Sequence, residues 1–261
     1  MKRFALTIIG CLIVVAVQAQ VIDPLNGDSL SEYTTTPVLD NSDGAGSGVA
    51  FSDTSGALTA SFTGTVSDPE QALFLAPASG FSTTFAVGDM LTVNTVVPAS
   101  STTEDFGLAI SATATPTAAG SGNGYNSRAT FDWASISVRP SQSSIRVNTS
   151  ISGTLTTGSN VAGVGSTANI SELFIDWVSA DSFQLGYVSN NVAVVDATAN
   201  FAPSSTIGTA IGFYGDLRVT GTSLGTLSDL AIQPIPVPEP STIALCGMGV
   251  ISSIFMLRRK K

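Results

Sequence analysis

Histidine is absent from this 261-residue chain, and its absence removes several kinds of chemistry at once. Without an imidazole there is no Ser-His-Asp or Cys-His catalytic arrangement and no histidine-ligated metal site. The two cysteines, Cys11 and Cys246, lie in apolar runs near the two ends. The long region between them therefore has no disulfide, no thiolate nucleophile and no thiolate metal ligand.

Basic residues are also scarce away from the ends. Residues 20–234 hold 18 acids against four arginines and no lysine, which gives a net charge of −14. Such a surface repels nucleic acid and anionic lipid, and it has no basic patch that would attract phosphates. The composition excludes nucleic-acid binding and suits a solvated exterior or bound divalent cations.

Helical patterns are missing from the same region. Apolar residues at helical spacing over eleven or more positions occur only in the two terminal segments. Serine and threonine together number 65, and these residues favour strands and turns over helix interiors. The middle of the chain is therefore predicted to be all-β.

The first 19 residues have the three parts of a secretory signal peptide. Lys2 and Arg3 open the chain, residues 4–17 are apolar, and Val17-Gln18-Ala19 offers small residues for cleavage after Ala19. Two alternatives stay open, namely a lipoprotein signal that uses Cys11 and an uncleaved membrane anchor.

The last 27 residues form a second distinct segment. Prolines at positions 234, 236, 238 and 240 favour an extended backbone, and an uncharged apolar run follows over residues 243–257. A helix over this run is about 22 Å long, shorter than the ~30 Å hydrocarbon core. Either local thinning of the bilayer or the polar edge at Ser241 and Thr242 absorbs the difference. The basic tail Arg258, Arg259, Lys260 and Lys261 is predicted to anchor this transmembrane helix on the cytoplasmic side. The residues alone do not distinguish it from a plain stop-transfer helix.

The order of features in residues 235–261 resembles the PEP-CTERM sorting signal. Val237, Pro238, Glu239 and Pro240, with Ser241 and Thr242, stand before the short apolar helix and the basic tail. In that family the Pro-Glu-Pro triad is recognised at the membrane by an exosortase during export. The resemblance implies a single-pass membrane precursor that is processed and delivered to the cell surface or the extracellular matrix, in association with exopolysaccharide.

Residues 20–234 are predicted to form one β-sandwich ectodomain of twelve to fourteen strands. Residues 90–97 are rich in β-forming side chains, and Phe106, Leu108 and Ile110 alternate with small or polar residues. The runs 173–177 and 183–187 are separated by a short turn, so they form a predicted hairpin. Asn190-Asn191 predicts a second tight turn.

Both ends of this region are similar to concanavalin A-like jelly rolls. The similarity is carried by Asp23–Tyr33 at the start, and by Ile211–Gly215 and Ser228–Ile232 near the close. It implies that the terminal strands lie side by side, with Ca²⁺ near one edge. Asp23, Asp40 and Asp229 are the candidate ligands. The run that begins at Asp40 does not have EF-hand spacing, because the first and twelfth ligand positions would fall on Leu39 and Ala50.

Catalysis by paired carboxylates has one weak candidate. Jelly-roll glycosidases of the laminarinase type use a Glu-x-Asp-x-x-Glu strand, and the nearest match here is Glu172 with Asp176. These two acids share one strand face, but no third acid follows within reach. The chain is therefore predicted not to be an enzyme.

Sugar binding remains as a second hypothesis. Tyr125, in a Gly- and Asn-rich loop, and Trp133 are the aromatic residues that we select as candidate contacts for a sugar ring. The leading hypothesis is a non-enzymatic surface or matrix protein. The alternatives are a lectin-like carbohydrate-binding module with a calcium-assisted site and, less favoured, a glycoside hydrolase.

Overall fold

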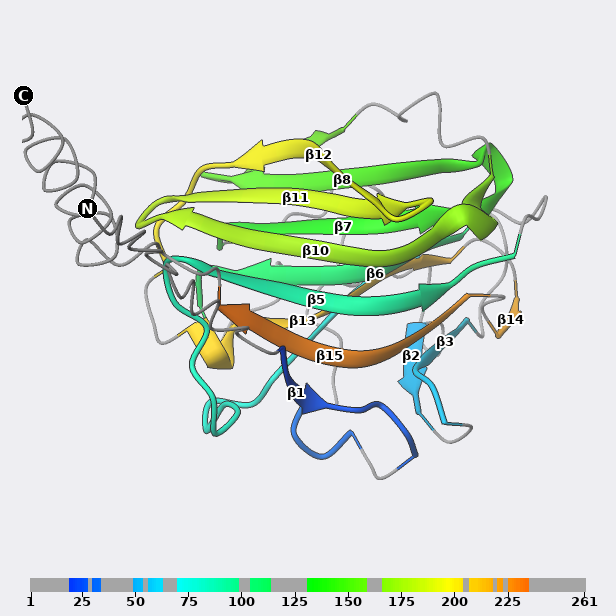
Figure 1. Cartoon of the computed structure of the whole chain (residues 1–261), viewed down its shortest axis with the longest axis horizontal. Coiled ribbons are helices and arrows are strands. Elements are labelled where there is room, and N and C mark those ends of the chain that lie inside the picture. The colour runs from blue at the N-terminus through cyan, green and yellow to red at the C-terminus, as the bar shows by residue number, and fades with distance from the viewer. Residues whose placement is uncertain are drawn as a thin grey trace, which may run out of the picture.

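The computed structural model describes residues 19–27, 30–33, 49–53, 56–62, 70–98, 104–113, 131–158, 166–203, 207–217, 220–222 and 225–234. Fifteen strands lie in these residues, and they form two six-stranded sheets and one three-stranded sheet (Figure 1). Every strand pairing in them is antiparallel. The all-β sandwich that the sequence predicts is thus confirmed.

The first sheet joins segments from both ends of the described chain. Its strand order is β1-β15-β5-β10-β11-β12. The bounds are Gln20–Asp23 for β1, Thr226–Pro234 for β15, Asp89–Val96 for β5, Ile170–Ser179 for β10, Ser182–Ser189 for β11 and Val192–Ala199 for β12. Because β1 pairs directly with β15, the prediction that the terminal strands lie side by side is confirmed.

The second sheet lies across the core from the first and has the order β4-β13-β6-β7-β8-β9. The bounds are Glu70–Leu75 for β4, Ile211–Leu217 for β13, Glu104–Ser111 for β6, Trp133–Arg139 for β7, Ser144–Ile151 for β8 and Thr154–Thr157 for β9. The strand β9 lies at the edge of this sheet, and the 3₁₀ turn η3 (Thr167–Asn169) leads directly into β10. Two further 3₁₀ turns are η2 (Pro140–Gln142) and η4 (Ile207–Thr209).

The small sheet has the order β14-β3-β2, with bounds Gly221–Thr222, Thr59–Phe62 and Val49–Ser52. It packs beside β13, where Gly215 leaves room for Val49 and Phe51. A Cβ added at Gly215 would lie 3.3 Å from Val49 Cγ1 and 3.4 Å from Phe51 Cζ. The small sheet therefore extends the same hydrophobic core.

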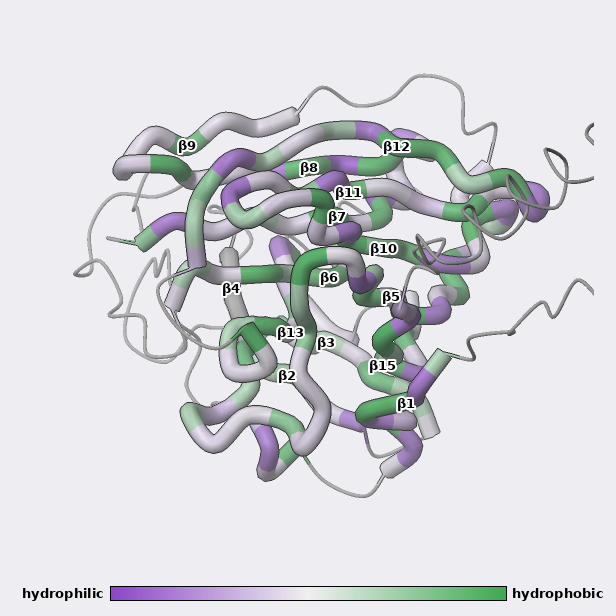
Figure 2. The backbone as a smooth tube through the Cα atoms, turned by 60° about the vertical axis from the view of Figure 1, so that its left-hand side comes forward, coloured by the Kyte–Doolittle hydropathy of each residue, from purple (hydrophilic) through white to green (hydrophobic). Residues whose placement is uncertain are grey.

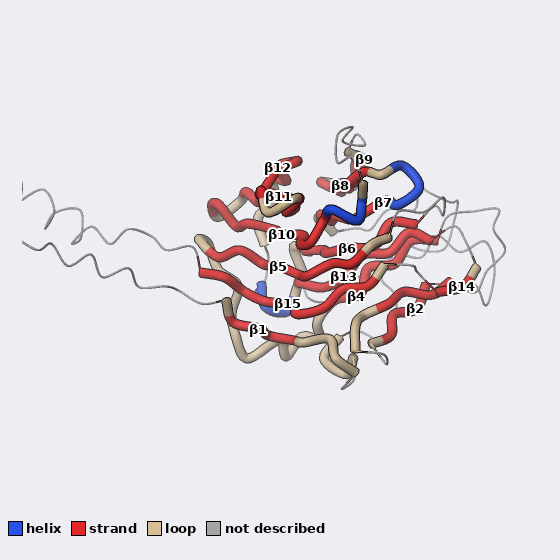
Figure 3. Tube along the Cα trace, turned by 45° about the vertical axis from the view of Figure 1, so that its right-hand side comes forward, coloured by secondary structure: helices blue, strands red, loops and turns tan. Residues whose placement is uncertain are grey.

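The core lies between the two large sheets (Figure 3). Hydrophobic and hydrophilic positions alternate along their strands, as Figure 2 shows, so each strand turns one set of side chains inward. The first sheet contributes residues such as Leu91, Leu173 and Phe183, and the second contributes Phe106, Leu108 and Ile136. The strand pattern predicted at residues 90–97 and 106–110 is confirmed.

Both predicted turns are also confirmed. Ser179 pairs with Ser182, so β10 and β11 form the expected hairpin around Ala180 and Asp181. Asn190 and Asn191 join β11 to β12 with φ values of +51° and +64°. Two consecutive positive φ values are the signature of a primed turn, and asparagine tolerates this backbone better than most residues.

The predicted segments at the two ends lie outside the described residues, apart from Ala19 at the predicted signal-peptide boundary. This applies to the remainder of residues 1–19 and to residues 235–261. Over the part of the chain that the structure describes, no helix has the length and apolar character that crossing a membrane requires.

Candidate functional site

The outer face of the second sheet, away from the core, carries an unusual row of polar side chains. Along β7 and β8 every second residue enters the core, and the residues between them point to the other face. We call the outer-face set of these two strands the polar strip. It consists of Trp133, Ser135, Ser137 and Arg139 on β7, and Ser144, Arg146, Asn148 and Ser150 on β8.

The strand register places the polar strip in four successive cross-strand pairs. These pairs are Trp133 with Ser150, Ser135 with Asn148, Ser137 with Arg146, and Arg139 with Ser144. The neighbouring strand β6 adds small side chains to the same face, because Gly107 and Ala109 pair with Ser137 and Ser135. Every residue of the strip is buried, with at most 7% of its surface exposed. So many buried polar residues on one face are uncommon in a protein, and we therefore take the strip as the candidate functional site.

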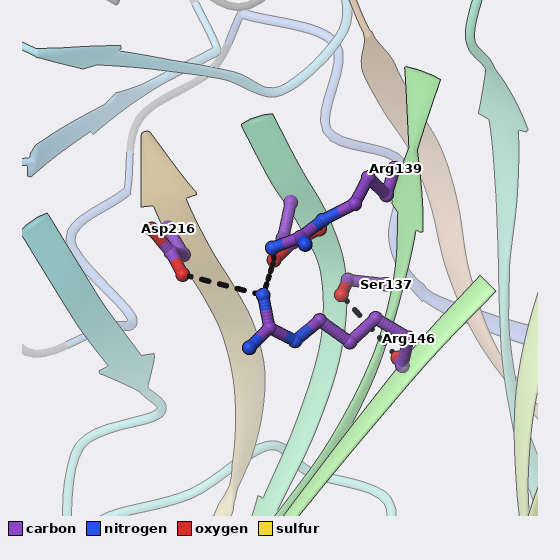
Figure 4. A network of polar contacts seen from close by, with 5 residues as sticks. Ser137, Arg139, Arg146 and Asp216 are labelled. Carbon is purple, nitrogen blue, oxygen red and sulfur yellow. Dashed lines mark hydrogen bonds and ion pairs between the residues drawn. The ribbon is translucent and has the colours of Figure 1, made fainter. Parts of the chain in front are cut away.

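One end of the polar strip is an ion network (Figure 4). Arg139 donates from Nε to Asp105 Oδ1 and from Nη2 to Asp105 Oδ2, both at 2.6 Å. Arg146 donates from Nη1 to the same Oδ2 at 3.0 Å, and this nitrogen lies 3.8 Å from Asp216 Oδ2. Figure 4 shows the two arginines converging from neighbouring strands while Asp216 approaches from the opposite side. The network joins β6, β7, β8 and β13 at one point.

The charges of this network balance. Two acids and two arginines lie together, although residues 20–234 hold only four arginines and carry a charge of −14. The bidentate Arg139–Asp105 pair has the geometry that makes a buried ion pair tolerable, because both carboxylate oxygens accept charged hydrogen bonds. Among the described residues, the charges of the network therefore cancel at this end of the strip, although the domain as a whole is strongly acidic.

Six side-chain atoms of the polar strip form no hydrogen bond in the structure although they are buried. They are Trp133 Nε1, Ser135 Oγ, Ser144 Oγ, Arg146 Nε, Asn148 Nδ2 and Ser150 Oγ. A buried polar group without a partner costs about 1–3 kcal/mol, and native proteins hold few of them. Their concentration on one face indicates that another polar molecule, either water or a ligand, completes these hydrogen bonds.

Trp133 was selected from the sequence as a sugar-stacking ring, and the structure does not place it for that role. Its side chain is 2% exposed, and its ring stacks on Tyr214 with the centroids 5.7 Å apart. Both rings pack with Ala109 in a small cluster separate from the main core. In this conformation the faces of the indole are not open to a sugar, whereas its Nε1 is one of the six atoms without a hydrogen bond. Tyr125, the other selected ring, lies outside the described residues.

Glu172 and Asp176 lie on the outer face of the first sheet, on the same face of β10 as predicted. Phe174 stands between them and lies over Gly186 of β11, where an added Cβ would overlap the Phe174 ring. Four residues along a strand separate two Cα atoms by roughly 13 Å. Burial raises the pKa of both carboxyl groups above their ordinary values. Asp176 Oδ1 forms no hydrogen bond, which is consistent with a carboxylate that is poorly compensated in its charged form.

Two of the three candidate calcium ligands, Asp23 and Asp229, lie among the described residues. Asp23 is buried, its Oδ1 accepts from the Leu25 N–H at 2.9 Å and its Oδ2 accepts from the Tyr33 hydroxyl at 2.9 Å. Asp229 lies one residue from the Asp23–Leu230 pair and its Oδ2 accepts from Asn94 Nδ2 at 2.9 Å. Asp40 is outside the described residues. No cluster of three or more acidic or thiol side chains suited to a metal occurs among the residues that the structure does describe.

Comparison with known proteins addresses the C-terminal segment directly. Residues 236–260 match the family model described as the PEP-CTERM protein-sorting motif. The chain carries a PEP-CTERM sorting motif. The match includes Pro238, Glu239 and Pro240, so the resemblance found from the residues is confirmed, and the motif implies processing by an exosortase-type enzyme. No curated protein sequence matches the chain.

Solved structures that resemble this chain are distant. A Bacillus subtilis protein, titled as having unknown function and a galectin-like fold, is 12% identical, with a TM-score of 0.47 over 81% of this chain and 94% of its own. A protein of unknown function from Shewanella oneidensis MR-1 is 12% identical, with a TM-score of 0.41 over 80% and 82%. The β-glucanase of Bacillus licheniformis is 13% identical, with a TM-score of 0.42 over 81% and 95%. With TM-scores below 0.5, these likenesses add nothing to the fold that the strand pairing already defines.

Sequence reasoning did not find the polar strip. Its signal was present, because polar residues occupy every second position in both Trp133–Arg139 and Ser144–Ser150. Such alternation usually marks a strand with one solvated face. Only the structure shows that this face is buried.

Proposed function

We propose that this protein is exported, held at the membrane by its C-terminal segment, and processed there by an exosortase to give a non-enzymatic surface or extracellular-matrix protein. The observation that carries the proposal is the match of residues 236–260 to the sorting motif. The acidic, lysine-free ectodomain supports it, because a net charge of −14 keeps the body soluble and away from anionic lipid. Residues 243–257 then contact the membrane lipid, and Arg258–Lys261 lie on the cytoplasmic side.

The mature C-terminus tests this proposal. In a host that has an exosortase, mass spectrometry of the exported protein is expected to show loss of the segment that follows the motif. Glu239→Ala is expected to leave the tail in place, because it removes the one charge of the Pro-Glu-Pro triad. Pro236→Ala, which changes a proline outside the triad, is the matched control. An unprocessed tail in the parent protein would refute the proposal.

The absence of catalysis is part of the same proposal. A retaining glycosidase needs two carboxyl groups ~5 Å apart and an inverting one about 6.5–9.5 Å. Glu172 and Asp176 are farther apart along β10, with the Phe174 ring between them. We expect no release of reducing ends from β-glucans, and no difference between the parent chain and Glu172→Gln. Hydrolysis that depends on Glu172 would contradict this.

Binding of a saccharide, such as an exopolysaccharide on the cell surface, is the second candidate. The polar strip favours it, because buried indole, amide and hydroxyl groups beside a charge-balanced network fit a polyhydroxylated ligand better than an ion. A glycan array probed with the full chain tests this function. A second array with a chelator tests the calcium hypothesis for Asp23, Asp40 and Asp229, since loss of binding is expected only if Ca²⁺ takes part.

A further inference from the structure

Four of the unpartnered atoms of the polar strip lie on two adjacent cross-strand pairs. Trp133 and Ser150 form one pair, and Ser135 and Asn148 form the next. Neighbouring strands are ~4.8 Å apart, and residues two positions apart along a strand are separated by roughly 6.6 Å. The Cα atoms of these four residues therefore span about 5 by 7 Å, which is the scale of one substituent on a sugar ring and not of a whole oligosaccharide.

The chemistry of these four groups specifies their partner. The indole Nε1 and the amide Nδ2 can only donate hydrogen bonds, while the two serine hydroxyls both donate and accept. A matching group must offer an acceptor to the indole and the amide, and it is best matched if it also has a donor for a serine. A carbonyl beside an N–H group meets both requirements, and so does a hydroxyl, which has two lone pairs and one donor. The apolar side chains beside the patch distinguish the two groups.

The charge of the surroundings excludes the obvious anionic alternative. A carboxylate would also accept from the indole and the amide. However, both arginines of the strip already have carboxylate partners, Asp105 for Arg139 and Asp105 with Asp216 for Arg146. An extra anion would bring its charge to a domain at −14 without a free cation in the strip to compensate it. A neutral group is favoured.

An apolar contact lies beside the patch. Leu155 of β9 pairs in register with Ser150, and both Leu155 and Phe131 pack against the cluster that contains Trp133. A small apolar substituent attached to the carbonyl would meet these side chains. Carbonyl, N–H and methyl together make an acetamido group.

Building on the proposed saccharide function, we infer that Trp133, Ser135, Asn148 and Ser150 form a subsite for the acetamido group of an N-acetylated saccharide. Trp133 Nε1 and Asn148 Nδ2 donate to the carbonyl oxygen, and a serine hydroxyl accepts from the N–H. The methyl group packs toward Leu155.

The experiment compares four probes on the purified full chain in detergent, which are N-acetylglucosamine, glucosamine, glucose and glucuronate. Saturation-transfer NMR and titration calorimetry measure binding. Trp177→Phe removes the other of the two tryptophans, so that the fluorescence of Trp133 alone reports on the site. N-acetylglucosamine is expected to bind at least tenfold more tightly than the other three and to change the Trp133 emission.

The matched variants are single substitutions that each remove one polar group. Ser135→Ala and Ser150→Ala each remove one buried hydroxyl that has no partner in the unliganded structure, so they are expected to fold at least as well as the parent. Each is expected to weaken N-acetylglucosamine binding by about tenfold, the size of one hydrogen bond. Ser171→Ala, on an exposed position of β10, is the control and is expected to have no effect. Trp133→Phe keeps a ring against Tyr214 but removes Nε1, and is expected to act like the serine variants.

The outcomes separate the two proposals. If glucose binds as tightly as N-acetylglucosamine and the serine variants bind both normally, saccharide binding stands and the acetamido subsite is wrong. If none of the probes and no array glycan binds, the strip holds only water, and both this inference and the saccharide function fall. Processing of the C-terminal motif is unaffected by either result, so the export proposal is tested independently.

Discussion

The ion network around Asp105 should dominate the stability of the second sheet. Asp105 is fully buried and accepts three charged hydrogen bonds, two from Arg139 and one from Arg146. Asp105→Asn keeps the shape of the side chain but removes its charge and one acceptor oxygen. Asp216 is then the remaining acid of the network, 3.8 Å from Arg146 Nη1, and Arg139 loses both of its charged hydrogen bonds to Asp105.

The expected loss of stability follows from the arginine charges that stay buried without their carboxylate partner. Breaking a buried ion pair by removing one partner costs about 3–5 kcal/mol, because an uncompensated charge stays in a poorly solvated place. For a domain of this size each kcal/mol lowers Tm by about 2–4 °C, so the variant should melt roughly 6–20 °C below the parent. The effect should change little between low and high salt, because screening acts weakly on buried charges.

Thermal and urea unfolding followed by circular dichroism provide the measurement. Asp181→Asn, at an exposed turn, is the control for loss of one acid and should shift Tm by no more than a degree or two. Replacing Asp105, Arg139, Arg146 and Asp216 together by leucine, which removes every charge of the network, should recover part of the loss. If Asp105→Asn melts within about a degree of the parent, the network is not a stabilising contact and the reasoning fails.

Three further changes test other parts of the structure. Burial raises the pKa of Glu172, so the folded state holds this proton more tightly than the unfolded state, and the stability that the group contributes falls as pH rises through the folded pKa. Glu172→Gln should therefore stabilise the protein at pH 7. Urea unfolding at several pH values should show that the difference vanishes below the ordinary pKa of 4.5. Gly186→Ala should destabilise by about 1–3 kcal/mol, because the new methyl group overlaps the Phe174 ring and the Val194 carbonyl, and an unchanged melting curve would contradict the packing described here. Val192 and Val195 leave the edge strand β12 with exposed apolar side chains, so Val195→Lys should reduce concentration-dependent light scattering relative to Ala193→Ser on the same strand.

Local patterns in the sequence predicted most of the sandwich. The alternation around Leu91 and Leu108, and the paired asparagines at 190 and 191, each depend on only a few neighbouring residues, and the structure reproduces them. The alternating serines of β7 and β8 were equally visible. Their burial was not predictable, because it depends on how distant segments pack and not on the period of the strand.

The residues of the candidate site could likewise be seen in the sequence, but their contacts could not be predicted from it. Two of only four arginines in residues 20–234 stand seven positions apart at 139 and 146, but their shared partner Asp105 is more than thirty positions away. Pairing over such a distance is set by sheet register, which the local pattern does not specify. Trp133 was selected for its ring face, whereas the structure leaves its N–H as the group that lacks a partner.

The place of β15 in the first sheet has a consequence for the order in which the domain can be completed. β15 lies between β1 and β5, so the first strand of the domain has no edge to join until the last one arrives. A chain that crosses a membrane N-terminus first would deliver residues 226–234 just before the motif. The first sheet of the newly translocated body would then stay incomplete until the residues next to the motif had crossed the membrane.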